Sequence, residues 1–396
     1  MSGRGAGYAL SGVEPGAARS PRGRLPAAVY AHAAGVYLLV QAVGVGVLAL
    51  LAARHDLTLL GRLTAWDGAW YLSLVEYGYD GVAPGLRDAH GEIFPEAPLA
   101  FFPLYPALVV GLAQLPGVGE VGAAITVSVL CGLVMALGLV RLARHLDPRP
   151  RVGLLAVALV AGAPMAITFA MVYTEALFCA LAVWALVFVL ERQWVLAGVA
   201  CLLAGLARST ASVLIGAVVL AALVAAWRGR DRAAALACVV LAPLGLLGFW
   251  GFVAVRTGSL TGWSDIEWRG WNTRYDFGGE TVGFVLDTLA EGPSVMQVGA
   301  VLAVFAAIGL GVLAFRRLPW PLALYGAGVV LLVVGTAGLP AAKPRFLLPA
   351  MVVLLLPVAM ALARRSRNTM LALTVAFVAL GVWYGGYALT GWRYAI

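Results

Sequence analysis

Apolar runs long enough to cross a lipid bilayer recur along most of the chain. A transmembrane helix needs about 20 apolar residues at about 1.5 Å each. The stretch 194–227 is too long for one straight span, and Arg208, Ser209 and Thr210 interrupt it, which predicts a hairpin of two short helices. The other expected membrane segments are 27–53, 121–143, 152–172, 175–190, 233–255, 295–315, 321–339, 346–363 and 370–390. The pattern therefore predicts an all-α, polytopic transmembrane bundle of about 11 membrane segments.

Composition agrees with this fold class. The chain is 62% hydrophobic and 12% charged, whereas a soluble domain is about half apolar and about one quarter charged. The four cysteines lie inside apolar runs and form no CxxC pair, so we interpret them as small buried side chains rather than zinc ligands or disulfides. An ordinary soluble globule, a disordered chain and a disulfide scaffold are excluded.

Charge gives the expected orientation. If the N-terminus is cytoplasmic, the inside segments hold 17 of the 27 basic residues but only four of the 19 acidic residues. This follows the positive-inside rule, so the net charge of +8 requires no nucleic-acid partner. We expect a disordered cytoplasmic tail over 1–26 and a single integral-membrane domain over 27–396, located in the cytoplasmic (inner) membrane.

Two of the expected outer loops are long, at about 54–120 and 256–294. They are rich in aromatic and charged residues, and loops longer than about 12–15 residues often carry function. We therefore expect the active site to face outside.

The first outer loop contains an amphipathic segment, TAWDGAWYLSLVEYGYDG. Asp67, Trp70, Tyr71 and Leu74 share one helical face, which predicts an interfacial helix that ends at Gly78. A carboxylate on an aromatic face suits a general base. The alternative is that Asp67 only caps the helix.

A proline-containing segment, PLAFFPLYPALVVGLAQLPG, follows. Prolines at 98, 103 and 106 disfavour a regular helix, so we expect a bend and then a short apolar helix that folds back against the membrane. Its aromatic residues, Phe101, Phe102 and Tyr105, either contact substrate or pack at the interface.

These two segments resemble a known family. WDGAWYLSLVEYGYD (66–80) followed by AFFPLYPALV (100–109) is similar to the PIG-V type mannosyltransferases, which have actinobacterial relatives. YTEALF (173–178), LAGLARSTA (203–211) and KPRFLLPA (343–350) add weaker similarity. The chain departs from the family at Ala69 and Trp70, where many members have a histidine, and at Ser209, which is often proline.

The resemblance implies a GT-C fold, with a catalytic acid in the first outer loop and a polyprenyl-phosphate sugar as donor. It makes Asp67 the expected base. For the donor phosphate we expect Arg208, Arg345 and Lys343, because Arg offers a bidentate fork for phosphate oxygens. The alternatives are a structural Glu175–Arg208 pair, and snorkelling of Lys343 and Arg345 to lipid headgroups. The expected substrate-binding residues are Trp66, Trp70, Tyr71, Glu76, Tyr79, Phe102, Tyr105, Glu175, Trp268 and Arg269.

The resulting hypothesis is an inverting membrane glycosyltransferase. The resemblance implies that it transfers mannose to a hydroxyl of a glycolipid, lipoglycan or protein acceptor. Membrane lipids are expected to contact the protein. We expect neither a cofactor nor a metal, because the long loops contain no DxD-type metal site. A transporter or lipid flippase is the main alternative, but the chain lacks evident inverted repeats and midplane acids. A non-catalytic partner of an envelope enzyme is a third possibility.

Overall fold

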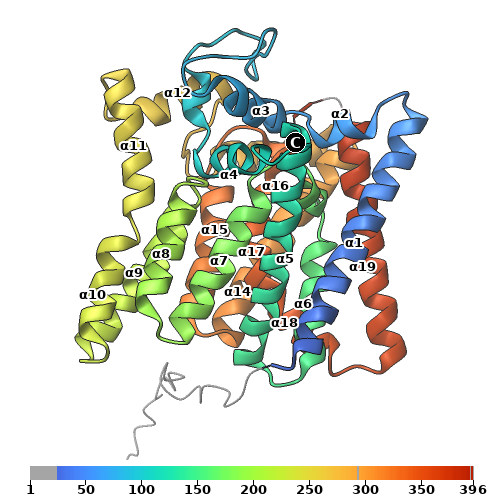
Figure 1. The fold of residues 1–396 in the computed structure, drawn as a ribbon. Helices are drawn as coiled ribbons and strands as arrows, with labels where there is room; N and C mark the ends of the chain where they lie inside the picture. Colours follow the sequence, from blue (N-terminus) through green and yellow to red (C-terminus); the bar gives the residue numbers. More distant parts are fainter. Residues whose placement is uncertain (1–24, 292–293, 393, 396) are drawn as a thin grey trace, which may run out of the picture.

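The computed structural model describes residues 25–291, 294–392 and 394–395 as one helical bundle (Figure 1). Within these residues there is no β-strand, only an isolated antiparallel bridge between Tyr275 and Thr336. The predicted all-α membrane fold is confirmed. The expected tail over 1–26 lies almost entirely outside the described residues.

Five helical segments of the described chain are long and apolar enough to cross a membrane. Four are continuous helices: α1 (Ala27–Arg54), α5 (Glu120–Leu146), α14 (Val295–Arg317) and α19 (Arg367–Thr390). The fifth consists of α10 (Arg232–Leu241) and α11 (Leu244–Thr257), with a break next to Pro243. Proline lacks an amide donor, which accounts for the break.

Shorter apolar helices fill the rest of the bundle. They are α6 (Pro150–Ala161), α7 (Glu175–Leu190), α8 (Trp194–Gly205), α9 (Ala211–Trp227) and α15 (Trp320–Val334). The predicted span 346–363 is divided by proline into α17 (Leu348–Leu354) and α18 (Leu356–Leu362). The number of complete spans, about 11, stays a prediction.

The predicted span 152–172 is only partly helical. After α6 the backbone is irregular and then forms a short 3-10 helix, η2 (Ala166–Ala170). Irregular backbone at membrane depth is tolerated where protein surrounds it. Residues 165–174 are buried, and the Gln41 amide donates to the carbonyl oxygens of Ala161 at 2.9 Å and Ala166 at 3.3 Å. A side chain of α1 thus satisfies carbonyls near this break.

Helix α7 lies in the middle of the bundle and is apolar on nearly every side. Twelve of its residues are buried, as expected for a helix that packs against neighbours all round. It packs closely on α5, where a Cβ on Gly138 would come within 2.7 Å of a Val183 methyl group. The first residue of α7, Glu175, is held at one end of this core.

The same end of the bundle carries the helices of the two long loops (Figure 1). The first loop contains α2 (Leu59–Leu63), α3 (Asp67–Tyr77), η1 (Ala97–Ala100) and α4 (Leu104–Ala113). This confirms the interfacial helix, its end at Gly78, and the bend before a short apolar helix. The second loop contains α12 (Gly262–Trp271) and α13 (Gly279–Ala290), two helices that the sequence pattern did not predict.

Candidate functional site

The start of α3 fixes the position of Asp67. Trp66 precedes it with φ of 57°, an unusual conformation for a bulky residue. The Asp67 amide donates to the Tyr173 hydroxyl at 3.3 Å, and that hydroxyl donates to the Ala65 carbonyl at 3.2 Å. Gly68 brings the helix close to the backbone before α7, since a Cβ there would lie 3.3 Å from the Val172 carbonyl oxygen. Asp67 is thus the first residue of the helix and not its cap.

An ion-pair cluster connects α3 to three other parts of the chain. The Asp67 carboxylate accepts a hydrogen bond from Arg345, which lies in the short helix α16 (Lys343–Phe346). Arg345 also lies 3.6 Å from the carboxylate of Glu175, and Arg208 lies 2.6 Å from the same oxygen. Glu175 is fully buried, whereas 26% of the Asp67 side chain is exposed. Two acids and two guanidinium groups therefore alternate, and Asp67 is the acid at the open side.

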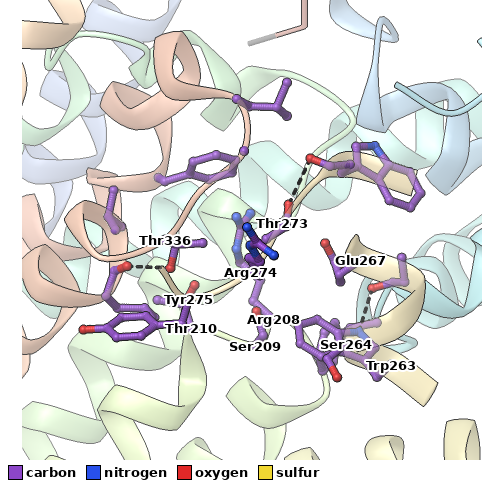
Figure 2. Close-up of a pocket in the computed structure, with 18 of the residues that line it drawn as sticks. Arg208, Ser209, Thr210, Trp263, Ser264, Glu267, Thr273, Arg274, Tyr275 and Thr336 are labelled. Carbon is purple, nitrogen blue, oxygen red and sulfur yellow. Dashed lines mark hydrogen bonds between the residues drawn. The ribbon is translucent and has the colours of Figure 1, made fainter. Parts of the chain in front are cut away.

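Asp67 and Arg208 line a cavity of about 400 Å³. Its wall comes from both long loops, from the break between α8 and α9, and from the chain between α15 and α16. Figure 2 shows Glu267 of α12 projecting into this space toward Arg208 and Arg274. The aromatic members of the wall are Tyr71, Phe101, Phe102, Trp250, Trp263, Trp271, Tyr275 and Phe346. The cavity thus combines charged groups with aromatic faces.

Arg208 occupies the predicted break of the helical hairpin. Besides its pair with Glu175, it donates to the Thr174 hydroxyl at 3.0 Å. Tyr71 of α3 donates to the same hydroxyl at 3.4 Å. The structural Glu175–Arg208 pair is therefore present, and Arg208 still lines the cavity. The two interpretations of Arg208 are compatible.

Glu267 belongs to the second long loop, whose acids, arginines and aromatic faces suit a sugar ring or a polar acceptor head, but it is not one of the expected substrate-binding residues. Burial, reinforced by the charge of Asp67, raises the pKa of the Glu267 carboxyl to about 8, although the charge of Arg208 opposes the shift. A carboxyl with this pKa is mostly neutral near pH 7 and can donate a hydrogen bond. The cavity therefore has one carboxylate paired with an arginine and a second carboxyl that is largely protonated.

Arg274, from the same aromatic and charged loop, is likewise not one of the expected substrate-binding residues, although it lines the cavity. Its guanidinium lies over the Trp268 ring, 4.0 Å from the centroid, and it lines the cavity. No ion pair joins it to a carboxylate within the described chain. Its position beside aromatic residues in this loop agrees with the expectation that the loop suits a sugar or a polar acceptor. Arg274 is thus a cation available to an anionic ligand.

Lys343 and Arg345 differ from the exposed cations that the sequence suggested. Both are nearly fully buried. The Lys343 ammonium donates to the carbonyl oxygens of Val333 at 2.8 Å and Thr336 at 2.7 Å. Each still contributes to the cavity wall, so a role toward phosphate stays a prediction. Neither side chain snorkels away from the protein.

The expected substrate-binding residues fall into two groups. Tyr71 and Phe102 line the cavity. Others support its wall: Trp70 stacks on Phe101, and Tyr79 donates to the Phe101 carbonyl at 2.8 Å. The residues outside the cavity lining are Trp66, Trp70, Glu76, Tyr79, Tyr105, Glu175, Trp268 and Arg269.

Three of the residues outside the cavity lining, Tyr105, Arg269 and Glu76, have contacts or exposure that do not involve the cavity. Tyr105 is buried and donates to the Ala124 carbonyl at 2.8 Å. Arg269 lies over the Phe94 ring at 4.2 Å, and Glu76 is exposed. These side chains therefore have structural contacts or face away from the cavity. Direct contact with substrate at these positions stays a prediction.

Comparison with known proteins supports the fold. No family model and no curated sequence matches the chain. The structure is similar to ArnT from Cupriavidus metallidurans bound to undecaprenyl phosphate, with a TM-score of 0.54, 17% identity, and coverage of 87% of this chain and 63% of that one. The apo state of the same protein gives a TM-score of 0.51 at 16% identity, covering 81% and 57%.

A third similar structure is the apo form of an oligosaccharyltransferase from Archaeoglobus fulgidus. Its TM-score is 0.46 at 14% identity, over 89% of this chain and 55% of that one. The chain spans less than two thirds of the length of each of these proteins. At these identities the likeness to the two ArnT structures concerns the fold alone, and this agrees with the GT-C type of fold expected from the sequence.

Proposed function

We propose that this chain is an inverting membrane glycosyltransferase that uses a polyprenyl-phosphate sugar. The observation that supports this most directly is the cavity, in which Asp67, held by Arg345, shares one space with the cations Arg208 and Arg274. A transfer from a lipid phosphate needs both a base for the acceptor and positive charge for the leaving group. The similar ArnT structure contains undecaprenyl phosphate in the same type of fold.

The proposed reaction is a single displacement. Asp67 accepts the proton of the acceptor hydroxyl, the hydroxyl oxygen forms a bond to the anomeric carbon, and the bond from that carbon to the phosphate oxygen breaks. The electron pair leaves with the polyprenyl phosphate, whose developing charge Arg208 and Arg274 stabilise. Arg345 acts as a positioning residue because it fixes the orientation of the Asp67 carboxylate.

Glu267 has a distinct place in this scheme. As a largely neutral carboxyl it donates a hydrogen bond to a phosphate oxygen or a sugar hydroxyl, rather than competing with Asp67 for the proton. Aromatic faces such as Trp263 and Trp271 form the part of the wall that suits a sugar ring. No step of the scheme requires a metal or a cofactor, because arginines neutralise the leaving phosphate.

The sugar and the acceptor follow from the resemblance to the PIG-V type enzymes. We propose mannose as the sugar, and a hydroxyl of a glycolipid, lipoglycan or protein at the outer face of the cytoplasmic membrane as the acceptor. The test is deletion of the gene followed by mass analysis of envelope glycolipids, lipoglycans and glycoproteins. Loss of one hexose from one species, restored by the intact gene, is the expected result. An unchanged set of glycans would count against the proposal.

A further inference from the structure

A second cavity lies between α14 and α18, near the end of the bundle opposite α3 and α12 (Figure 1). It has a volume of about 300 Å³ and is separate from the candidate active site. Its wall contains three arginines, Arg317, Arg364 and Arg365, and no carboxylate. The rest of its wall is apolar, from Leu313, Pro357, Met360 and Ala361. The cavity thus combines a concentrated positive charge with a hydrophobic wall.

Within the described chain, none of the three arginines forms an ion pair. A nearby carboxylate, that of Asp147, is already engaged: Arg149 donates to it at 2.8 Å and 2.6 Å. Arg149 also donates to the Ala363 carbonyl at 3.4 Å, which places this neutralised pair next to the end of α18. Arg364 still interacts electrostatically with Asp147, so the pair offsets the positive charge of the cavity only in part.

We propose that this cavity binds the headgroup of an anionic phospholipid. Guanidinium groups match the geometry of a phosphate, with two parallel hydrogen bonds from each fork. The apolar residues of the wall suit the glycerol and first acyl carbons, and basic pockets between membrane helices are suited to such headgroups. In the proposed orientation the cavity opens at the cytoplasmic leaflet, where anionic lipids supply this chemistry.

A lipid in this position would connect α14 to the segment between α18 and α19, and α14 contacts α18 and α19 only sparsely. Arg317 is the last residue of α14, while Arg364 and Arg365 lie between α18 and α19. One phosphate held by all three would relieve their mutual repulsion. The site does not depend on the proposed glycosyl transfer.

The test measures lipid binding to the purified full-length chain by native mass spectrometry. The probes are phosphatidylglycerol, phosphatidylcholine and inorganic phosphate. The pocket variant combines Arg317→Gln, Arg364→Gln and Arg365→Gln. Its matched control combines Arg228→Gln, Arg230→Gln and Arg232→Gln, which removes the same charge from exposed residues at the α9–α10 turn. Thermal unfolding of both variants shows whether they remain folded.

We expect the pocket variant to bind phosphatidylglycerol at least about tenfold more weakly than the parent chain, given the attraction that each basic residue contributes. The control should change less than about twofold, and phosphatidylcholine should bind equally to all three. Should the pocket variant fail to fold, a variant with lysine in place of the three arginines is compared with the parent chain instead. It keeps the charge but lacks the guanidinium forks, so it should also bind phosphatidylglycerol more weakly. An equal loss of phosphatidylglycerol binding in the control would mean that the lipid is attracted by diffuse surface charge, and it would overturn the proposed site. Displacement of the lipid by inorganic phosphate would overturn the lipid assignment, and so would undiminished binding to the pocket variant.

Discussion

Asp67 and Arg345 are 278 positions apart in the chain, yet they form one hydrogen-bonded ion pair. Arg345 is almost fully buried, so its charge depends on Asp67 and Glu175 for compensation. A single guanidinium nitrogen of Arg345 donates to Asp67, and the planar, buried guanidinium has little freedom to reorient. At the scale of single residues, the site is therefore a carboxylate whose direction is set by its neighbour.

The first prediction concerns this orientation. Arg345→Gln should lower kcat by about 100-fold, because displacing a reacting group by about 1 Å has effects of this size. The KM for the donor should change much less, as Arg208 and Arg274 still face the phosphate. Arg345→Lys, which keeps the charge but not the fork, should recover only part of kcat. A large rise in donor KM with kcat intact would instead mean that Arg345 binds the phosphate directly.

The second prediction concerns pH. Since the pKa of Glu267 is about 8, its neutral form dominates below that pH and its charged form above it. The charged form would repel the donor phosphate, so activity should fall as pH rises through about 8. Glu267→Gln stays neutral at every pH and should remove this decline while keeping activity near neutral pH within about threefold. An unchanged pH profile in Glu267→Gln would exclude Glu267 as its cause.

At the scale of the elements, the hairpin break between α8 and α9 carries a charge into the bundle. Arg208 is paired with a fully buried Glu175. Without Arg208, Glu175 keeps only Arg345 at 3.6 Å as a cation, and breaking a buried pair costs up to about 3–5 kcal/mol, whereas replacing both partners by apolar groups is often close to neutral. The break is thus held by Glu175 and Arg208, with Arg345 as a second, more distant cation beside Glu175.

The third prediction follows from this pair. Arg208→Met should destabilise the chain by up to about 3–5 kcal/mol, seen as a lower unfolding temperature in detergent. Adding Glu175→Leu should recover much of that stability without recovering transferase activity. If Arg208→Met unfolds at the parent temperature, the pair is not a stabilising element.

Several elements followed from the sequence for clear physical reasons. The apolar face of 67–77, the glycine at 78, the prolines near 98–106 and the charge at 208 are local signals, and α3, α4 and the α8–α9 hairpin agree with them. The shortening of the predicted span at 152–172 was not foreseen, because its irregular backbone is satisfied by Gln41 of a distant helix. Helix α12 was missed because its apolar face is made of scattered aromatics in a charged loop.

Within the site, too, local signals were visible in the sequence, whereas contacts between distant segments were not. Asp67 and Arg208 stood out because charges are rare in this chain. Glu267 and Arg274 belong to the aromatic and charged second loop that suits a sugar or a polar acceptor, but only the folded chain brings that loop and the first one to the same cavity. The ion pair between Arg345 and Asp67 also joins distant parts of the chain, so the segment KPRFLLPA (343–350) alone could not predict it.

At the scale of the whole molecule, the proposed reaction requires one orientation of the bundle in the membrane. The candidate active site lies at the end of the bundle that carries α3 and α12, and the arginine-lined second cavity lies near the opposite end (Figure 1). The uneven distribution of basic and acidic residues favours a cytoplasmic location for the second end.

The fourth prediction tests this orientation with cysteine labelling. Leu260, before α12, is 97% exposed, and Arg230 is exposed in the α9–α10 turn. In intact cells, a membrane-impermeant maleimide should label Leu260→Cys, but should label Arg230→Cys only after permeabilisation. Three of the four native cysteines are buried, so the parent chain provides the background. The reverse labelling pattern would place the site on the cytoplasmic side.

The proposed base role of Asp67 is the step on which the proposed glycosyl transfer depends. Its most direct test is Asp67→Asn, assayed in membranes supplied with labelled polyprenyl-phosphate mannose and an envelope acceptor fraction, with unfolding temperature measured alongside. Because general base catalysis contributes about 100-fold to 10,000-fold, we predict a loss of transfer within that range while the protein stays folded. Transfer by folded Asp67→Asn at the parent rate would contradict the base role of Asp67.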